Sequence, residues 1–246
     1  MNILRTIGRY AADILRWPGL MIASLLVFCQ FFVLNTTIVR GLEHLPTRRG
    51  VLYLSRHVSF PDSYLLGFII AVRWRMVFRP WLFPWHTAAR ENFFHTRWLR
   101  MVAWFLKIAS VTDGRKDQSL LLKLPKLVKA GSVLTFPLGG LERSGRELKP
   151  VPGIGRTIYH SKVVIPIWIS DGMRDVYPPR VRNIVWRVPR GKTIEVIIGP
   201  PVELADLQTL PECRDTWVQL ADRTFRAMYE LGGITLPDTD AQSVAR

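Results

Sequence analysis

The chain has 246 residues, enough for one sizeable domain or one domain with an appendage. It carries 34 Lys and Arg against 19 Asp and Glu, a net charge of +15, yet its mean hydropathy is positive, at +0.13, and it contains nine Trp. A basic chain that is also apolar and aromatic indicates an anionic membrane surface as partner and argues against nucleic acid, whose binding proteins more often carry their charge on a polar chain. Cys29 and Cys213 are too far apart in sequence for a metal-ligand spacing or a disulfide framework, so we expect a reducing compartment.

The segment 1–40 has the pattern of a membrane anchor. Arg5, Arg9 and Arg16 are spaced among apolar residues as in an amphipathic helix that lies at a membrane interface. Pro18 is predicted to end this helix, and an almost wholly apolar run follows over 19–34. That run is just short of the roughly 17–25 residues that cross a bilayer upright.

Basic residues flank the apolar run on both sides, so the positive-inside rule selects no orientation. A single span stays open, and so does a pair of helices that dips into the bilayer and returns on the same side. A secretory signal peptide is disfavoured because the run ends in Asn35-Thr36-Thr37, without an A-x-A-like cleavage site. We expect an N-terminal membrane-associated helix pair that holds the protein at the cytoplasmic face of a membrane, the inner membrane if the source is bacterial.

From Ile38 onward, short β-like runs alternate with helical patterns. Strands are predicted at Val51–Leu54, Ile108–Val111, Val133–Pro137, Val163–Ile169 and Thr193–Ile198. Helices are predicted at Tyr64–Val72, Trp98–Ile108, Leu120–Lys129, Gly155–His160 and Cys213–Leu231. This alternation favours an α/β fold with a mostly parallel central sheet flanked by helices. We therefore expect an anchoring segment over 1–40, one domain over 41–236 and a flexible tail over 237–246.

The stretch Leu52–Gly67 contains the most informative pair of side chains. His57 follows a predicted strand, and Asp62 comes five residues later, after Pro61, which suits the first turn of a helix. On one regular helix this spacing would put the two on different faces, but a loop that turns into the helix can bring the carboxylate back onto the imidazole. An Asp bonded to one ring nitrogen fixes the tautomer and leaves the other nitrogen free to take a proton. The structural alternatives are an Asp that only complements the helix dipole and a Ser59 that only caps.

A second group of candidate residues follows the predicted strand at Val133–Pro137. Gly139 and Gly140 expose backbone N–H groups, and Arg143 offers a planar fork of donors. Together these groups suit a phosphate ester. Loops at the carboxyl ends of strands line the ligand crevice of an α/β sheet, so we expect this loop and the His57 loop to meet. Without other evidence, an ordinary solvent-exposed turn is a simpler interpretation of this loop than a phosphate site. From the residues alone, the candidates in this loop are Gly139, Gly140, Arg143 and Lys149.

Taken together, the two groups resemble the glycerolipid acyltransferase superfamily, in the form of the PlsC-like lysophosphatidic acid acyltransferases. The resemblance rests on an H-x-S-x-x-D block that begins at His57 and on a later F-P-x-G, at Phe136–Gly139, with a nearby R-S, and it covers roughly Gly41–Val202. It implies that His57 and Asp62 form the catalytic dyad and that the loop beginning at Phe136 binds the glycerol phosphate of the acceptor. The candidate substrate-binding residues then also include Ser59, Phe136, Pro137 and Ser144. The strand at Val163–Ile169 looks like the family's later V-P-[IV]-x-P-V strand.

The sequence departs from the family pattern at three places. Arg56 stands where the family usually has Asn. Leu138 replaces the Glu of the family's F-P-E-G, so that position lacks its usual carboxylate. Arg143 comes later after the glycine than the motif places it, which makes Glu142 a candidate for the displaced acid.

Three runs further along the chain resemble tafazzins, the phospholipid–lysophospholipid transacylases of the same superfamily. They are Gly153–Ile158, Ile165–Trp168 and Gly172–Pro178.

The resemblance implies an acyltransferase that moves a fatty acyl chain from acyl-CoA or an acyl carrier protein to the free hydroxyl of a lysophospholipid such as 1-acyl-glycerol-3-phosphate. The His-Asp dyad would be the general base, with no metal and no cofactor beyond the acyl donor. No G-x-S-x-G elbow is present, so we expect direct transfer without an acyl-serine. The alternatives are a tafazzin-like transacylase and a non-catalytic, basic membrane-surface binding protein. Nucleic-acid binding ranks last, because no recognition motif accompanies the charge.

Overall fold

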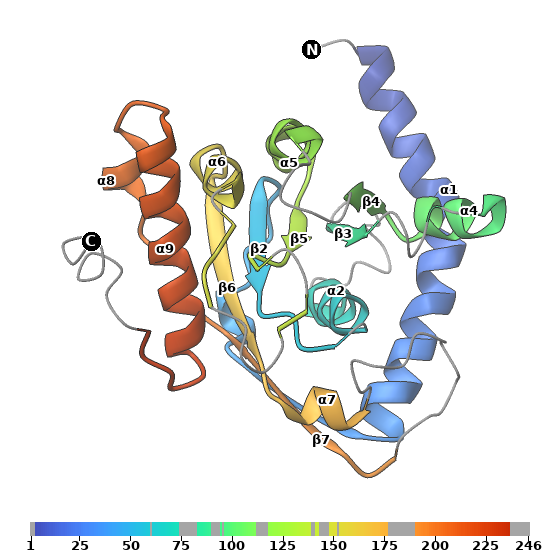
Figure 1. The fold of residues 1–246 in the computed structure, drawn as a ribbon. Helices are drawn as coiled ribbons and strands as arrows, with labels where there is room; N and C mark the ends of the chain where they lie inside the picture. Colours follow the sequence, from blue (N-terminus) through green and yellow to red (C-terminus); the bar gives the residue numbers. More distant parts are fainter. Residues whose placement is uncertain are drawn as a thin grey trace.

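The computed structural model describes residues 3–59, 61–73, 83–89, 94, 96–111, 118–138, 141–142, 148–151, 153–176 and 190–236. Over these residues, the centre is a seven-stranded sheet with the order β1-β7-β6-β2-β5-β3-β4 (Figure 1). The strands are β1 (Thr36–Arg40), β2 (Val51–Ser55), β3 (Trp85–Ala89), β4 (Ile108–Val111), β5 (Val133–Thr135), β6 (Val163–Ile169) and β7 (Thr193–Ile198). Neighbouring strands are parallel except for the antiparallel pair β6–β7. The predicted α/β fold with a mostly parallel sheet is confirmed.

Helices flank the sheet, and the central strands are buried on both faces. In β2, Val51 and Tyr53 pack into the apolar cluster that contains α2, whereas Leu52 and Leu54 pack into the cluster formed with α5, α6 and α9. Such two-sided burial explains why the predicted central strands are continuous apolar runs. The helices are α1 (Ile3–Phe28), α2 (Asp62–Arg73), α4 (Arg97–Phe105), α5 (Gln118–Ala130), α6 (Gly153–Tyr159), α7 (Gly172–Val176), α8 (Ala205–Gln208) and α9 (Arg214–Glu230), with a π-helical turn at Cys29–Val33 and a 3₁₀ turn at Leu42–His44.

The predicted N-terminal helix pair is wrong, because α1 runs unbroken through Pro18 and continues into the π-helical turn. A proline inside a helix removes one hydrogen bond and crowds the preceding turn, a cost of about 3 kcal/mol. Packing on α2 and α4 offsets this cost. At Gly19 the helix comes so close to α4 that an added Cβ would lie 3.0 Å from the Phe105 side chain. Within the described part of the chain, one helix, Ala11–Val33, is long and apolar enough to cross a membrane.

A buried cluster of charged side chains also connects α1 to the segment just before β4. Oδ1 of Asp13 lies 3.0 Å from Nη1 of Arg16 and 3.0 Å from Nζ of Lys107. Nε of Arg16 donates to the backbone carbonyl of Trp104, at 2.9 Å. Burial lowers the pKa of Lys107 to about 8, although the Asp13 carboxylate acts in the opposite direction. The middle of α1 is therefore held by specific polar contacts as well as by apolar packing.

Candidate active site

The loop between β2 and α2 folds back so that Asp62 reaches His57. Oδ2 of Asp62 lies 3.2 Å from Nδ1 of His57. The same oxygen accepts hydrogen bonds from the backbone N–H groups of Val58, at 2.7 Å, and Ser59, at 3.0 Å. These bonds to the main chain hold the turn closed, and they bring together two side chains that one regular helix would separate.

The environment of this pair sets the direction of proton transfer. The Asp62 side chain is fully buried, whereas the His57 side chain is 18% exposed. A carboxylate can only accept, so a neutral His57 carries its hydrogen on Nδ1 and has a free lone pair on Nε2. No described residue forms a hydrogen bond with Nε2. The arrangement can therefore take a proton from a hydroxyl group that approaches this nitrogen.

The loop that follows β5 lies against the His57 loop. The strands β2 and β5 are parallel neighbours, so both loops leave the same edge of the sheet. The Phe136 ring stacks on the His57 imidazole, with a centroid distance of 4.0 Å and an interplanar angle of 18°. The backbone N–H of Glu142 donates to the His57 carbonyl, at 2.6 Å. The two loops meet, as the sequence predicts.

The other predicted substrate-binding residues occupy varied surroundings. Ser59 is buried, and its backbone N–H holds Asp62. The carbonyl of Pro137 accepts a bond of 2.8 Å from the Val151 N–H, which ties the exposed Lys149 segment to the same loop. Substrate contact stays a prediction for all three. Gly139, Gly140, Arg143 and Ser144 lie outside the described residues.

A buried ion pair lies beside His57 and was not predicted. Arg56 donates from Nε and Nη2 to the two carboxylate oxygens of Glu142, with both bonds 2.6 Å long. The Tyr229 hydroxyl donates to Oε2 of Glu142, at 2.7 Å. Burial alone would raise the pKa of Glu142, but the hydrogen bonds from Arg56 and Tyr229 lower it below its usual range. Glu142 is therefore a carboxylate at neutral pH.

The sequence contains only a partial signal for this network. The departures from the family pattern single out Arg56 and Glu142, but they do not indicate that the two form a pair. Tyr229 lies in α9, where the helical pattern predicts an ordinary core residue. Asp171, whose Oδ1 accepts a bond of 2.8 Å from Arg56, precedes one of the tafazzin-like runs and has no distinguishing feature of its own.

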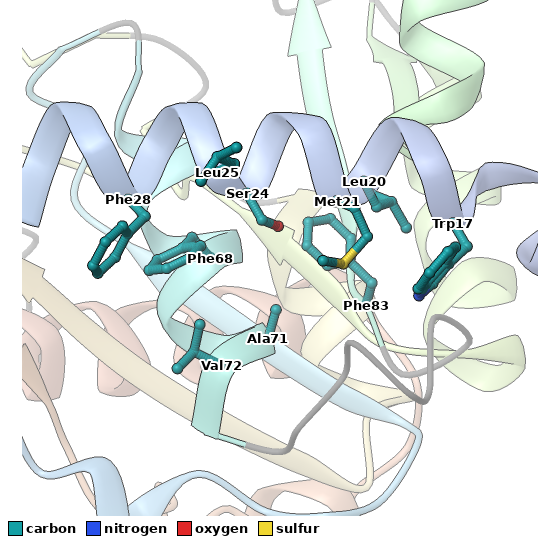
Figure 2. A pocket seen from close by; sticks show the side chains of 10 residues that line it. All are labelled: Trp17, Leu20, Met21, Ser24, Leu25, Phe28, Phe68, Ala71, Val72 and Phe83. Carbon is teal, nitrogen blue, oxygen red and sulfur yellow. The ribbon is translucent and has the colours of Figure 1, made fainter.

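An apolar groove of about 220 Å³ lies between α1 and α2. Figure 2 shows aromatic and aliphatic side chains of both helices on its walls, with Phe83 beside them. The α2 residues of the groove lie about 9–15 Å along the helix axis from Asp62, at 1.5 Å per residue. The lining residues are Trp17, Leu20, Met21, Ser24, Leu25, Phe28, Phe68, Ala71, Val72 and Phe83.

Among the described residues, no three His, Cys, Asp or Glu side chains group as metal ligands.

Two comparisons with known proteins identify a family and a similar fold. The family model described as Acyltransferase matches residues 36–170, more than half of the chain. Among solved structures, the fold is similar to that of the 1-acyl-sn-glycerophosphate (LPA) acyltransferase PlsC from Thermotoga maritima, with a TM-score of 0.55 and 16% sequence identity over 95% of this chain and 85% of that one. No curated protein sequence matches.

Proposed function

The chain belongs to the acyltransferase family, and we propose that it transfers a fatty acyl chain to the free hydroxyl of a lysophospholipid such as 1-acyl-glycerol-3-phosphate. The structural similarity to an acyltransferase that acts on 1-acyl-glycerophosphate supports this choice of acceptor. The observation that carries the proposal is the contact between Nδ1 of His57 and Asp62, because it places the lone pair of a neutral ring on Nε2, with which no described residue forms a hydrogen bond.

In the proposed reaction, Nε2 of His57 takes the proton of the acceptor hydroxyl as the hydroxyl oxygen bonds to the carbonyl carbon of an acyl thioester. The tetrahedral intermediate then loses its carbon–sulfur bond, and the imidazolium returns the proton to the departing thiolate. Asp62 stabilises the imidazolium and keeps the ring in one tautomer. General-base assistance of this kind is worth ~10²–10⁴ in rate, and the side-by-side positioning of both substrates contributes further.

The shape and charge of the molecule suit an anionic lipid substrate. The groove between α1 and α2 is apolar, and α2, which forms one of its walls, begins at Asp62. We therefore assign the groove to the acyl chain of a substrate. The net charge of +15 favours an anionic membrane and an anionic donor, acyl-CoA or an acyl carrier protein. Arg143 and Lys149 would bind the acceptor phosphate, as the family resemblance implies.

A tafazzin-like transacylase is the second candidate, because three runs of the sequence resemble that branch of the superfamily. Two glycines of those runs have a separate, structural explanation. A Cβ on Gly155 would collide with the backbone carbonyl of Trp217 in α9, and a Cβ on Gly172 would collide with the backbone carbonyl of Thr193 in β7, so close packing alone requires glycine at both positions. The donor must therefore be tested directly.

The test is an analysis of products by mass spectrometry. The purified protein is incubated with mixed lysophospholipids and, in separate reactions, with acyl-CoA, with an acyl carrier protein carrying an acyl chain, or with a diacyl phospholipid alone. We expect a diacyl product in a thioester reaction. A product only with the phospholipid donor would instead identify a transacylase, and no product with any donor would leave a non-catalytic membrane-binding protein.

A further inference from the structure

Glu142 holds two consecutive residues of the His57 loop at once. Its backbone N–H donates to the carbonyl of His57, at 2.6 Å, while its carboxylate takes both bonds from Arg56, the residue just before. Glu142 belongs to the loop after β5, and the ring that stacks on His57, Phe136, begins that same loop. The position of this loop is therefore linked to the position of the imidazole by three separate contacts.

The Arg56 side chain is fixed on its other side by the end of β6. Its guanidinium lies 4.3 Å from the centroid of the Trp168 ring, and Nη1 donates to the Ile169 carbonyl at 3.3 Å. Nη2 also donates to Asp171, at 2.8 Å. The hydroxyl group of Tyr229, in α9, donates a hydrogen bond to the Glu142 carboxylate. The ends of β2, β5 and β6 and one face of α9 thus converge on the Arg56–Glu142 pair, and Nη2 of Arg174, in α7, lies 3.5 Å from Oε1 of Glu142.

The burial of this pair calls for an explanation. Arg56 and Glu142 are 4% and 9% exposed, and a buried ion pair is often no more stabilising than well-packed apolar residues of similar volume. Loss of one member, in contrast, leaves an uncompensated buried charge. A contribution to stability alone therefore does not require these two residue types, whereas two-point bonding by a planar guanidinium fixes orientation as well as distance.

We propose that Arg56 and Glu142 are positioning residues that set the orientation of the His57 imidazole. Their bidentate pairing fixes the loop after β5, so that Phe136 fixes the plane of the imidazole and the Glu142 N–H fixes the main chain that carries it, while Asp62 bonds Nδ1. Without the pair, the loop after β5 relaxes, the stack on Phe136 loosens and Nε2 no longer faces one direction. The effect on catalysis rests on the proposed function, but the orientation of the ring does not.

The kinetic test compares Glu142→Gln with the double variant Arg56→Met/Glu142→Gln. The single variant leaves the buried Arg56 with only the exposed Asp171 as a carboxylate partner, so both its thermal midpoint and its kcat should fall. The double variant removes both charges, so its thermal midpoint should return close to that of the wild type while kcat stays about tenfold or more below it, with KM little changed. Recovery of kcat in step with stability would show a purely structural pair and overturn the inference.

The control is Arg223→Met/Asp206→Asn, which removes an ion pair between α8 and α9 in which Nη1 of Arg223 donates to both carboxylate oxygens of Asp206. This control should leave kcat unchanged, and an equal loss of kcat there would also contradict the inference.

A second readout does not depend on activity. With ¹³C-labelled histidine, NMR reports the stack of the His57 imidazole on Phe136, because the Phe136 ring current shields the imidazole protons. The wild type should show shielded His57 ring signals, and the double variant should show them shifted toward those of an unstacked imidazole. Unshifted His57 ring signals in the double variant overturn the inference whatever the kinetics. If the wild type transfers no acyl group from any donor while these signals still shift in the double variant, the proposed function fails and the positioning role stands.

Discussion

The Asp62 carboxylate bonds two backbone N–H groups as well as the His57 imidazole. It therefore shapes the loop and orients the ring at the same time. A substitution that keeps the shape but changes the donor pattern separates these two roles. Asparagine has nearly the same shape, but its amide oxygen accepts hydrogen bonds while its NH₂ group only donates them. If the amide oxygen accepts from the main-chain N–H groups, the NH₂ group must face another neighbour.

We expect Asp62→Asn to lower the rate of acyl transfer by about 10²-fold or more, because Nδ1 of His57 loses the acceptor that fixes its tautomer. Its free energy of unfolding should fall by only about 1–3 kcal/mol, as for one poorly satisfied buried group. The measurements are kcat at saturating substrate and chemical unfolding of the same preparation. An unchanged rate would reduce Asp62 to a helix-capping residue.

The His57–Asp62 pair was predictable because its geometry is local. Five residues and a proline are enough to indicate a strand, a turn and the start of a helix. The pairs that hold the loop from outside are not local. Glu142 is 86 residues from Arg56 and 87 from Tyr229, and nothing in a single sequence specifies which distant charges or hydroxyl groups meet.

Helix α6 approaches α9 at Gly155, where no side chain fits. We expect Gly155→Ala to force the two helices apart and to lower the free energy of unfolding by about 1–3 kcal/mol. Gly131→Ala is the matched control, because an added Cβ there meets its nearest atom at an ordinary 3.8 Å. Urea unfolding of both variants measures the difference, and equal stabilities would contradict the close packing.

The stability of the fold should depend on pH through Lys107, because burial disfavours its ammonium form by more than Asp13 favours it. Burial lowers the pKa of Lys107 to about 8, from 10.5. Between these two values the unfolded chain binds more protons than the folded one, so the free energy of unfolding should rise with pH. One pKa unit is worth about 1.4 kcal/mol, so the wild type should gain roughly 2–3 kcal/mol relative to Lys107→Met between pH 7.5 and 10.5. Urea unfolding across this range checks the gain, and parallel curves for the two proteins would refute it.

Two strands were not predicted, and both lack the apolar run by which the other strands were found. In β1 only every second residue is partly buried, and the strand pairs with β7 alone. In β3 the sequence is Trp-His-Thr-Ala-Ala, and its histidine, His86, is buried with a pKa that burial and the nearby Lys107 lower to about 3. The strand order cannot be inferred locally either, because the first strand of the sheet, β1, pairs with the last one in the sequence, β7.

Helices α1 and α4 lie along one side of the molecule (Figure 1). Both carry large exposed apolar side chains. Ile22 and Leu25 of α1 are 64% and 62% exposed, and Trp98 of α4 is 65% exposed. In a basic protein such a surface favours an anionic lipid bilayer, which accepts apolar side chains and attracts positive charge.

We expect Ile22→Glu/Leu25→Glu to reduce the fraction of protein bound to vesicles of phosphatidylglycerol severalfold, because two charges replace apolar contacts with the bilayer. Leu210→Glu, an exposed leucine beside α8, is the control and should bind as the wild type does. Cosedimentation at fixed salt measures the bound fraction, and equal binding of both variants would place the membrane contact elsewhere.

Acyl transfer through the His57 imidazole is tested most directly by His57→Ala, with His160→Ala as the control. His160 pairs with Glu212, away from the loops that meet at His57. Initial rates of transfer from an acyl thioester to a lysophospholipid should fall by ~10²–10⁴-fold for His57→Ala and stay near the wild-type rate for His160→Ala, with both variants folded. A folded His57→Ala protein that transfers acyl groups at the wild-type rate would contradict the role assigned to this imidazole.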